Sequence, residues 1–196
     1  MSEISSPLLK ALDEIWSVLK GLGLPMAVTG GLSLSMWNHP RSTHDVDLLL
    51  LIDECRHEEL LNTLLDAGAR FKRDEPIVKL GGVDLIQVLY EPAETYLDVQ
   101  VDILIARSEF HRNALQRAVS MTIETLNLQV VSCEDLILLK LLAGRIIDQA
   151  DTAALILANK EDLDREYLLR WAREQDLEKD LNRIWNEALP GDQLSS

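Results

Sequence analysis

The sequence predicts an α+β fold in which an α/β core is followed by a helical part. Short apolar runs typical of strands alternate with helical patterns through residues 1–131, whereas residues 132–196 carry helical patterns only. The 196 residues suit one core of ordinary size with an appended helical part. We therefore expect two parts, an α/β core over 1–131 and a C-terminal helical part over 132–196 that packs on the core.

The periodicity of apolar residues places the individual elements of the core. Helices are expected over residues 7–20, 32–37, 57–67 and 110–119. Strands are expected over residues 26–29, 46–52, 77–80, 83–89, 96–106 and 121–131. Ser6 and Pro7 are typical of the start of a helix, and Gly81-Gly82 is typical of a tight hairpin. After a capping box at 132–135, the apolar positions fit three or four helices.

The composition is that of a globular protein. Hydrophobic residues make up 47% of the chain and charged residues 27%. No stretch approaches the roughly 18 uncharged apolar residues of a membrane span, and the first residues lack a secretory signal pattern, so we expect a cytoplasmic protein that does not contact a membrane. Cys55 and Cys133 show no metal-ligand spacing and are expected to be structural.

The net charge of -14 disfavours a long nucleic acid as the default partner. Affinity for a phosphate backbone comes from cations that displace its counterions. The total charge does not exclude a local basic groove, and acidic residues that gather around metal ions add to the negative count without repelling a metal-bound triphosphate. The net charge therefore disfavours a long nucleic acid as a partner but does not exclude one.

Two carboxylates are expected to lie side by side at the start of the strand over 46–52. In a strand, residues i and i+2 point to the same face, so Asp45 and Asp47 share a face while Val46 points into the core. Magnesium binds carboxylate oxygens and completes its octahedron with water and substrate phosphates. Asp45 and Asp47 are therefore candidate metal ligands.

The glycines that precede this strand are the candidate phosphate site. Without Cβ atoms, Gly30 and Gly31 allow backbone N–H groups to approach a phosphate closely. A glycine pair alone also fits a simple tight turn, and an Asp-x-Asp pattern alone occurs in many surface loops. It is the combination within 24 residues, from Ala27 to Leu50, that indicates a nucleotide site.

A third carboxylate is needed to bridge two metal ions and to activate an attacking hydroxyl group. The strand expected over 96–106 offers Asp98 and Asp102 on one face. Asp102 is preferred because its apolar neighbours are typical of a central strand, whereas Asp98 lies near the strand start and is expected to be solvated.

These residues resemble the nucleotidyltransferase superfamily typified by DNA polymerase beta, and within it the AbiEii-type branch. The superfamily pattern corresponds to Val28-Thr29-Gly30-Gly31, Asp45-Val46-Asp47-Leu48 and Asp102. The branch pattern corresponds to Arg41, Thr43, Asp45 and Asp47, followed by Ser132, Glu134, Asp135, Leu136, Lys140, Leu141, Ala143, Arg145, Asp148 and Asp151. The resemblance spans about residues 27–155 and rests on the whole combination.

The resemblance implies a mixed, largely antiparallel sheet flanked by helices, with a C-terminal helical bundle. It implies an enzyme that uses two Mg²⁺ ions, or Mn²⁺ in their place, to transfer a nucleotidyl group from a nucleoside triphosphate such as ATP to a hydroxyl group, with release of pyrophosphate. Acceptors in such families are proteins, tRNA or small molecules, and some members belong to toxin–antitoxin pairs. The alternative is a catalytically silent nucleotide-binding or interaction protein on the same fold.

The resemblance also assigns residues. Asp45, Asp47 and Asp102 are implied as the catalytic metal ligands, and the implied nucleotide-binding residues are Gly30, Gly31, Arg41, Thr43 and Lys140. From the residues alone, Arg41 and Thr43 fit phosphate binding or ordering of the loop equally well. Lys140 fits a solvated position, a pair with a carboxylate or a reach into the cleft. Arg145, Asp148 and Asp151 fit an ion-pair network at i, i+3 spacing.

Overall fold

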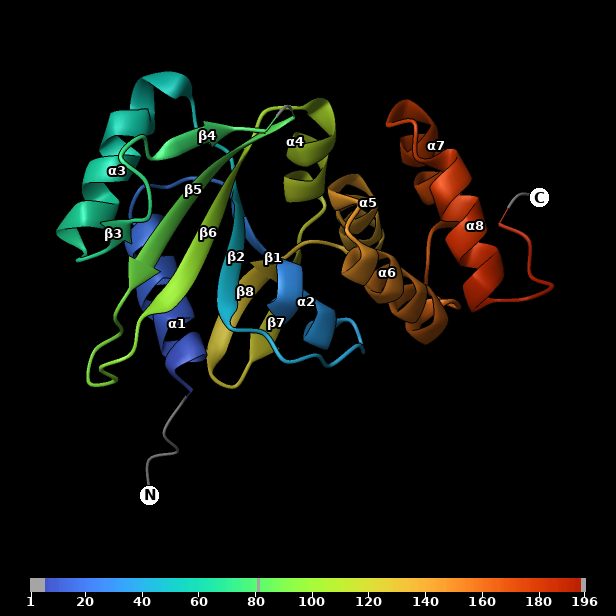
Figure 1. The fold of residues 1–196 in the computed structure, drawn as a ribbon, viewed down its shortest axis with the longest axis horizontal. Coiled ribbons are helices and arrows are strands. Elements are labelled where there is room, and N and C mark those ends of the chain that lie inside the picture. The colour runs from blue at the N-terminus through green and yellow to red at the C-terminus, as the bar shows by residue number, and fades with distance from the viewer. Residues whose placement is uncertain (1–5, 81, 195–196) are drawn as a thin grey trace. The chain divides into compact units, whose positions relative to one another are not determined.

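A computed structural model describes residues 6–80 and 82–194 of the chain (Figure 1). The described residues form two compact units. The first comprises the residues up to Leu32 together with Ser42–Val130, and the second comprises Ser33–Arg41 together with the residues from Val131 onwards. The first unit holds the whole sheet, and the second holds the C-terminal helices. The boundary between residues 131 and 132 that the sequence suggests stays a prediction.

The sheet of the first unit is mixed and largely antiparallel, as the resemblance implies. Its strand order is β3-β5-β6-β2-β1-β8-β7, and β4 pairs with β5 beside this path. Only the pairs β1–β8 and β2–β6 are parallel among the described strands. The strands are β1 Met26–Thr29, β2 Asp45–Leu50, β3 Arg70–Phe71, β4 Ile77–Lys79, β5 Val83–Tyr90, β6 Val99–Ala106, β7 Val119–Ile123 and β8 Leu126–Val130.

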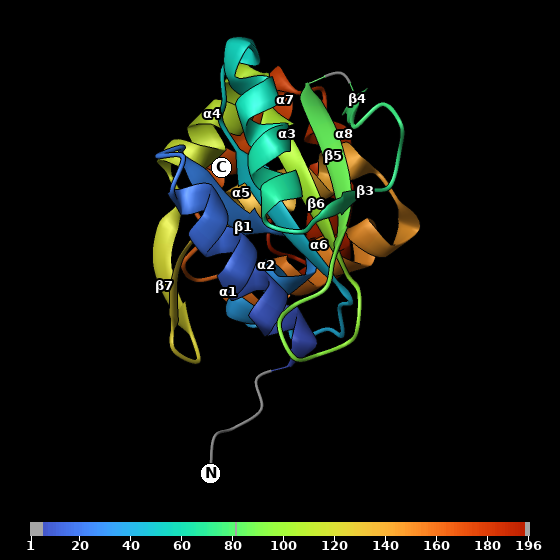
Figure 2. The same cartoon turned by 90° about the vertical axis from the view of Figure 1, so that its left-hand side faces the viewer.

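One face of the central strands is covered by α1 (Pro7–Lys20) and α3 (His57–Asp66), which lie side by side in front of the sheet in Figure 2. α1 begins where the sequence predicts, because the Ser6 hydroxyl accepts a hydrogen bond from the Leu9 N–H at 3.3 Å. Further helical segments in this unit are η1 (Glu54–Arg56) and α4 (Glu109–Gln116), which packs against β2. α2 (Gly30–Met36) begins in this unit and ends in the other.

The alternation of side chains along β5 and β6 explains how this sheet separates core from site. On β6, Val101, Ile103 and Ile105 are fully buried, whereas Gln100, Asp102 and Leu104 are only half-buried. β5 alternates in the same way along its eight residues. Successive residues of a strand point to opposite faces, so the buried set forms the core and the half-buried set, which includes Gln100 and Asp102, lies on the opposite face.

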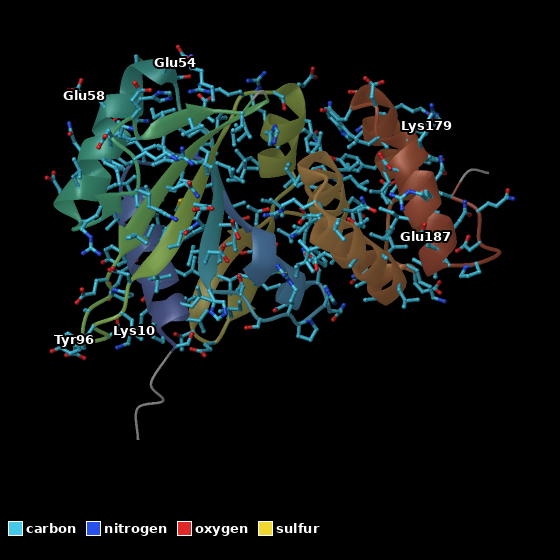
Figure 3. All side chains as sticks on the ribbon, in the orientation of Figure 1. Lys10, Glu54, Glu58, Tyr96, Lys179 and Glu187 are labelled. Atoms are coloured by element: carbon cyan, nitrogen blue, oxygen red, sulfur yellow. The ribbon has the colours of Figure 1, made fainter. Side chains whose placement is uncertain are left out.

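Two expected strands differ from the structure. β6 begins at Val99 rather than at residue 96, because Tyr96 has φ 53°, a left-handed conformation that cannot continue a strand. Tyr96 is 87% exposed, at the tip of the loop between β5 and β6 (Figure 3). The alternating run over 121–131 is a hairpin of β7 and β8 rather than one strand, and Glu124 at φ 50° lies in its turn. A turn without glycine or proline leaves the alternation unbroken.

The remaining expected elements of the core are confirmed within about two residues, except that the helix expected over 110–119 ends at Gln116. β4 and β5 pair as an antiparallel hairpin, as predicted. Gly81, which was expected in its turn, lies outside the described residues. The expected end of α3 at Gly68 is also confirmed, since this glycine follows the C-cap residue Ala67 with φ 87°.

Besides the end of α2, the described residues of the second unit form the helices α5 Cys133–Ala143, α6 Ile146–Asn159, α7 Arg165–Glu174 and α8 Glu178–Ala188. α5 begins at Ser132, whose hydroxyl accepts a hydrogen bond from the Asp135 N–H at 3.2 Å, so the predicted cap is confirmed. α5 packs against α6 and α7, and α8 packs against the same two helices. No helix in the described part of the chain is long and apolar enough to cross a membrane.

Candidate active site

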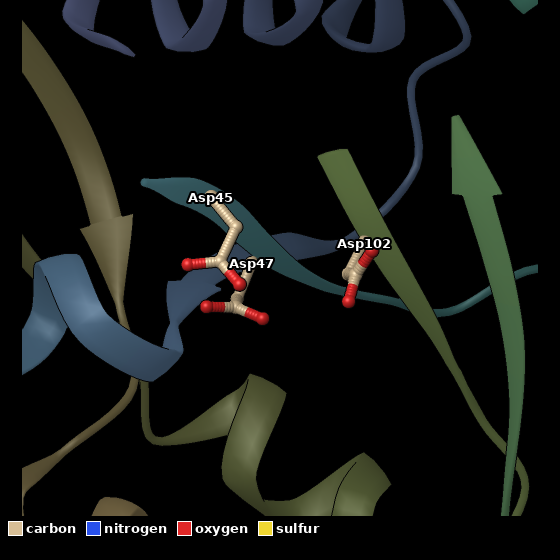
Figure 4. Close-up of side chains that lie close together, drawn as sticks. All are labelled: Asp45, Asp47 and Asp102. Atoms are coloured by element: carbon tan, nitrogen blue, oxygen red, sulfur yellow. The ribbon is translucent and has the colours of Figure 1, made fainter. Parts of the chain in front are cut away.

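Three carboxylates lie close together on the sheet (Figure 4). Asp45 and Asp47 stand two residues apart on β2, and Asp102 on β6 is the parallel cross-strand partner of Asp47. One oxygen from each of the three lies within 4.8 Å of the others, and all three residues are half-buried. The structure therefore brings together the three side chains that the sequence singles out.

The charge of this cluster fits a divalent cation. Two unit negative charges 4.8 Å apart repel each other by about 1 kcal/mol in water and by about 3–4 kcal/mol at an effective dielectric constant of 20. Such crowding costs stability unless a cation neutralises it. Carboxylate oxygens on a partly exposed face are the donors that Mg²⁺ and Mn²⁺ take, with water and phosphate as the remaining ligands. The residues present therefore fit a divalent metal ion of this kind.

Hydrogen bonds hold each carboxylate in place. The Thr43 hydroxyl donates to Asp45 Oδ1 at 2.8 Å, and the Gly31 N–H donates to Asp47 Oδ2 at 3.3 Å. Asp102 accepts hydrogen bonds from two side-chain amides, Gln87 Nε2 at 3.2 Å and Gln100 Nε2 at 2.9 Å, both measured to Oδ1. Thr43 thus contacts the site through Asp45, and its predicted part in nucleotide binding stays a prediction.

The sequence places only one of the two glutamines that contact Asp102, Gln100, on the same face as this carboxylate. Gln100 stands two residues before Asp102 on the same strand, so the alternation of side chains places it on the face of the carboxylates. Gln87 gave no such signal, because it belongs to β5 and meets Asp102 only through the antiparallel register of β5 and β6. A register between two strands is a tertiary property that one strand's pattern does not reveal.

Both glycines lie against side chains of the site. Gly30 has φ 62°, and a Cβ atom on it would lie 1.9 Å from Asp47 Oδ2. A Cβ atom on Gly31 would lie 2.4 Å from the Thr43 hydroxyl oxygen. Real Cβ atoms do not approach other atoms so closely, so the glycines are required for the packing of Asp47 and Thr43. This reason for the glycine pair adds to the turn and the phosphate site considered from the sequence.

Asp98 lies away from the cluster. It precedes β6, and both of its carboxylate oxygens are 2.6 Å from Arg70 Nη2. Its side chain and that of Arg70 are exposed. Among the described residues, the only group of three or more potential metal ligands contains Asp102 and not Asp98.

The remaining predicted residues form an ion-pair network within the second unit. Lys140 is buried, and its Nζ lies 3.0 Å from Asp148 Oδ1 and 2.9 Å from Asp151 Oδ2, so the solvated interpretation of this lysine is wrong. Arg145 pairs with Asp148 at 2.6 Å, which confirms the i, i+3 pair, and Arg41 lies 3.6 Å from Asp151. Burial opposes ionisation of Asp148, but hydrogen bonds from Arg145 and Lys140 outweigh it and lower the pKa of this carboxyl group.

Comparison with protein families shows which family the chain belongs to. Residues 12–180 match the family described as "Nucleotidyl transferase AbiEii toxin, Type IV TA system". The chain belongs to this AbiEii nucleotidyltransferase family. The match covers both compact units and most of the chain. A comparison with curated proteins found no match.

Solved structures that resemble this AbiEii-family chain show a nucleotidyltransferase fold. An antigenic nucleotidyltransferase-like protein from Paracoccidioides brasiliensis is 20% identical, with 93% of this chain and 94% of that chain aligned and a TM-score of 0.52. ANT(2'')-Ia in complex with adenylyl-2''-tobramycin is 16% identical, with 85% and 97% aligned and a TM-score of 0.56. JHP933 from Helicobacter pylori is 17% identical, with 98% and 84% aligned and a TM-score of 0.51. At these identities, the likeness shows a shared nucleotidyltransferase fold.

Proposed function

We propose that this chain is an active, metal-dependent nucleotidyltransferase that transfers a nucleotidyl group from a nucleoside triphosphate to a hydroxyl group of an acceptor, with release of pyrophosphate. The observation that carries the proposal is that one carboxylate oxygen from each of Asp45, Asp47 and Asp102 lies within 4.8 Å of the others. A protein that had lost catalysis would gain stability by losing these repelling charges. Their retention supports an enzyme over a silent binding protein.

Each carboxylate has a proposed role. Asp45 and Asp47 would hold both metal ions, and Asp102 would hold one of them. Bound Mg²⁺ or Mn²⁺ supplies positive charge that stabilises the charge developing on the phosphates. Asp102 would accept the proton of the acceptor hydroxyl group. At the same time the oxygen of that hydroxyl group would form a bond to the α-phosphorus, and the bond from the α-phosphorus to the pyrophosphate oxygen would break.

The proposed nucleotide-binding residues come from two parts of the chain. Gly30, Gly31 and Thr43 belong to the first unit, and Gly31 and Thr43 hydrogen bond to the carboxylates. Arg41 and Lys140 belong to the second unit and already pair with Asp151, so a triphosphate would have to share them with this carboxylate. We retain them as proposed ligands of the triphosphate, on the strength of the family resemblance.

The acceptor class is open between a protein, tRNA and a small molecule. The family description names a toxin of a toxin–antitoxin system, and ANT(2'')-Ia carries an adenylylated aminoglycoside in its complex. In keeping with the apolar pattern of the chain, the proposed place of action is the cytoplasm. The net charge of -14 disfavours a long nucleic acid as acceptor.

The experiment that tests the proposal is transfer of label. The purified chain is incubated with each α-³²P-labelled nucleoside triphosphate and Mg²⁺, together with cell extract, purified tRNA or an aminoglycoside. Label on one acceptor class and release of pyrophosphate are expected, and neither should occur with the Asp45→Asn/Asp47→Asn variant. Binding of triphosphate without transfer to any of these acceptors would instead favour the catalytically silent alternative.

A further inference from the structure

Two neutral amides hold one oxygen of Asp102. Gln100 Nε2 lies 2.9 Å from Asp102 Oδ1, and Gln87 Nε2 lies 3.2 Å from the same oxygen. The other oxygen, Oδ2, accepts a longer hydrogen bond from Gln87 Nε2, at 3.3 Å. Gln87 is the cross-strand partner of Asp102, and Gln100 precedes it by two residues, so all three side chains lie on one sheet face.

Lys72 sets the direction of the Gln100 amide. Its Nζ lies 2.6 Å from Gln100 Oε1. An ammonium group can only donate hydrogen bonds, so the amide oxygen must face Lys72 and the amide NH₂ group must face Asp102. The main chain of Lys72 is fixed as well, because its N–H donates to the Gln87 carbonyl oxygen at 3.0 Å. A chain of oriented hydrogen bonds thus runs from Lys72 through Gln100 to Asp102.

The chemistry of these donors suits a carboxylate that must keep its charge. An arginine or lysine in direct contact with Asp102 would fix its orientation, but the cation would also neutralise the charge that attracts a divalent metal ion. A glutamine amide donates a hydrogen bond and carries no net charge. The one cation in this chain of bonds, Lys72, is exposed and is separated from Asp102 by the Gln100 amide.

We propose that Gln87 and Gln100 are positioning residues that orient the Asp102 carboxylate for the metal ion and the acceptor hydroxyl group, and that Lys72 acts through Gln100. This inference deepens the proposed function and rests on it. Residues that hydrogen bond to metal ligands from behind fix the orientation of those ligands, and their loss typically costs about 10-fold to 100-fold in metal affinity or activity.

The test uses substitutions that keep side-chain length and remove the amide. Gln87→Met and Gln100→Met should each lower kcat for nucleotidyl transfer by about 10-fold or more, while KM for the triphosphate changes by less than about twofold. The matched control is Gln129→Met on β8, because this glutamine hydrogen bonds only to the exposed Ser120 hydroxyl among its described contacts, and it should keep wild-type kcat. Equal melting temperatures of the three variants would show that the loss of rate is not a loss of fold.

Lys72 is tested by a double-mutant cycle. If it acts only through Gln100, Lys72→Met should lower kcat by a few-fold, and Lys72→Met/Gln100→Met should be no slower than Gln100→Met alone. Independent, multiplying losses would overturn the role assigned to Lys72.

Binding of Mn²⁺ alone provides a readout that does not depend on turnover. Titration of the chain with Mn²⁺, followed by the electron paramagnetic resonance of the free ion, should show about 10-fold weaker binding at one site in Gln87→Met and Gln100→Met and no change in Gln129→Met. Unchanged Mn²⁺ affinity and kcat in the two variants, with a wild-type chain that binds Mn²⁺, would overturn the positioning role alone. A wild-type chain that binds no Mn²⁺ would overturn the proposed function itself, and this inference with it.

Discussion

Replacement of Asp102 by asparagine separates the catalytic role of this carboxylate from its effect on stability. Asparagine keeps the shape of the side chain, and its amide oxygen can still accept a hydrogen bond from Gln100. What the variant loses is one negative charge, one metal ligand and the proton acceptor. The lost acid–base contribution alone should lower the transfer rate by about 10² to 10⁴, while the triphosphate still binds at Asp45 and Asp47.

The same variant should melt at a higher temperature without metal. The neutral amide of Asp102→Asn removes two of the three carboxylate repulsions, each across at most 4.8 Å. At dielectric constants between those of water and of a protein surface, each repulsion is worth about 1–4 kcal/mol. The half-exposure of the cluster places each of the two near the lower value, so the net gain is about 2 kcal/mol, or about 4–8 °C in Tm. For a chain of this size, about 1 kcal/mol corresponds to a rise of about 2–4 °C in Tm.

Asp98→Asn is the matched control, because it removes a carboxylate that pairs with exposed Arg70 outside the cluster. It should change the rate little and the stability by less than about 1 kcal/mol. The measurements are label transfer at saturating triphosphate and thermal unfolding in the presence of EDTA. Near wild-type turnover of Asp102→Asn, or an equal collapse of Asp98→Asn, would refute the assignment of Asp102.

Three further predictions concern ligand binding, the network of the second unit and pH. A nucleoside triphosphate with Mg²⁺ at about 100 times Kd should stabilise the fold by about 2.7 kcal/mol, which differential scanning calorimetry would register as a rise of roughly 5–10 °C in Tm, and no shift at millimolar concentrations would count against the nucleotide site. Lys140→Met leaves Asp148 and Asp151 buried without their shared lysine, so urea unfolding should show a loss of about 3–5 kcal/mol, and a loss below about 1 kcal/mol would contradict the structural weight of this network. Burial lowers the pKa of His111 from its ordinary value of 6.5 to about 4. Between pH 6.5 and pH 4, this histidine therefore binds a proton in the unfolded chain but stays neutral in the folded chain. Stability should therefore fall by up to about 3 kcal/mol as the pH drops from 6.5 to 4, and a His111→Gln variant with an equally steep pH dependence would show that other groups are responsible.

The sequence predicts the carboxylate site well because the signal for it is local. Two aspartates at i and i+2 must share a face of any strand, so the side-by-side placement of Asp45 and Asp47 follows from chain geometry alone. The approach of Asp102 requires only that two apolar strands become neighbours, which the family resemblance supplies. The start of β6 was missed because the left-handed φ of Tyr96 depends on the loop before the strand.

Contacts between side chains of different helices and strands were harder to predict from the sequence. The pairing of Gln87 with Asp102 depends on the register of β5 and β6, and the burial of Lys140 depends on how α5 packs against α6. Periodicity marks which face of an element is apolar, but it does not say which polar side chain of a neighbouring element will meet it. Lysine on a leucine-rich helix therefore fitted three interpretations until its two carboxylate partners were located.

The fit of Gly30 against Asp47 has a consequence for sequence variation. A single methyl group on Gly30 would take the space of the Asp47 carboxylate, so the two positions are not independent. Among related chains, a residue larger than glycine is expected at the position of Gly30 only where the residue at the position of Asp47 is small or has no carboxylate. The presence of glycine at position 30 therefore indicates that the aspartate at position 47 is held as it is here. Replacement of this glycine in a relative would indicate a site in which the carboxylate is no longer in the same position.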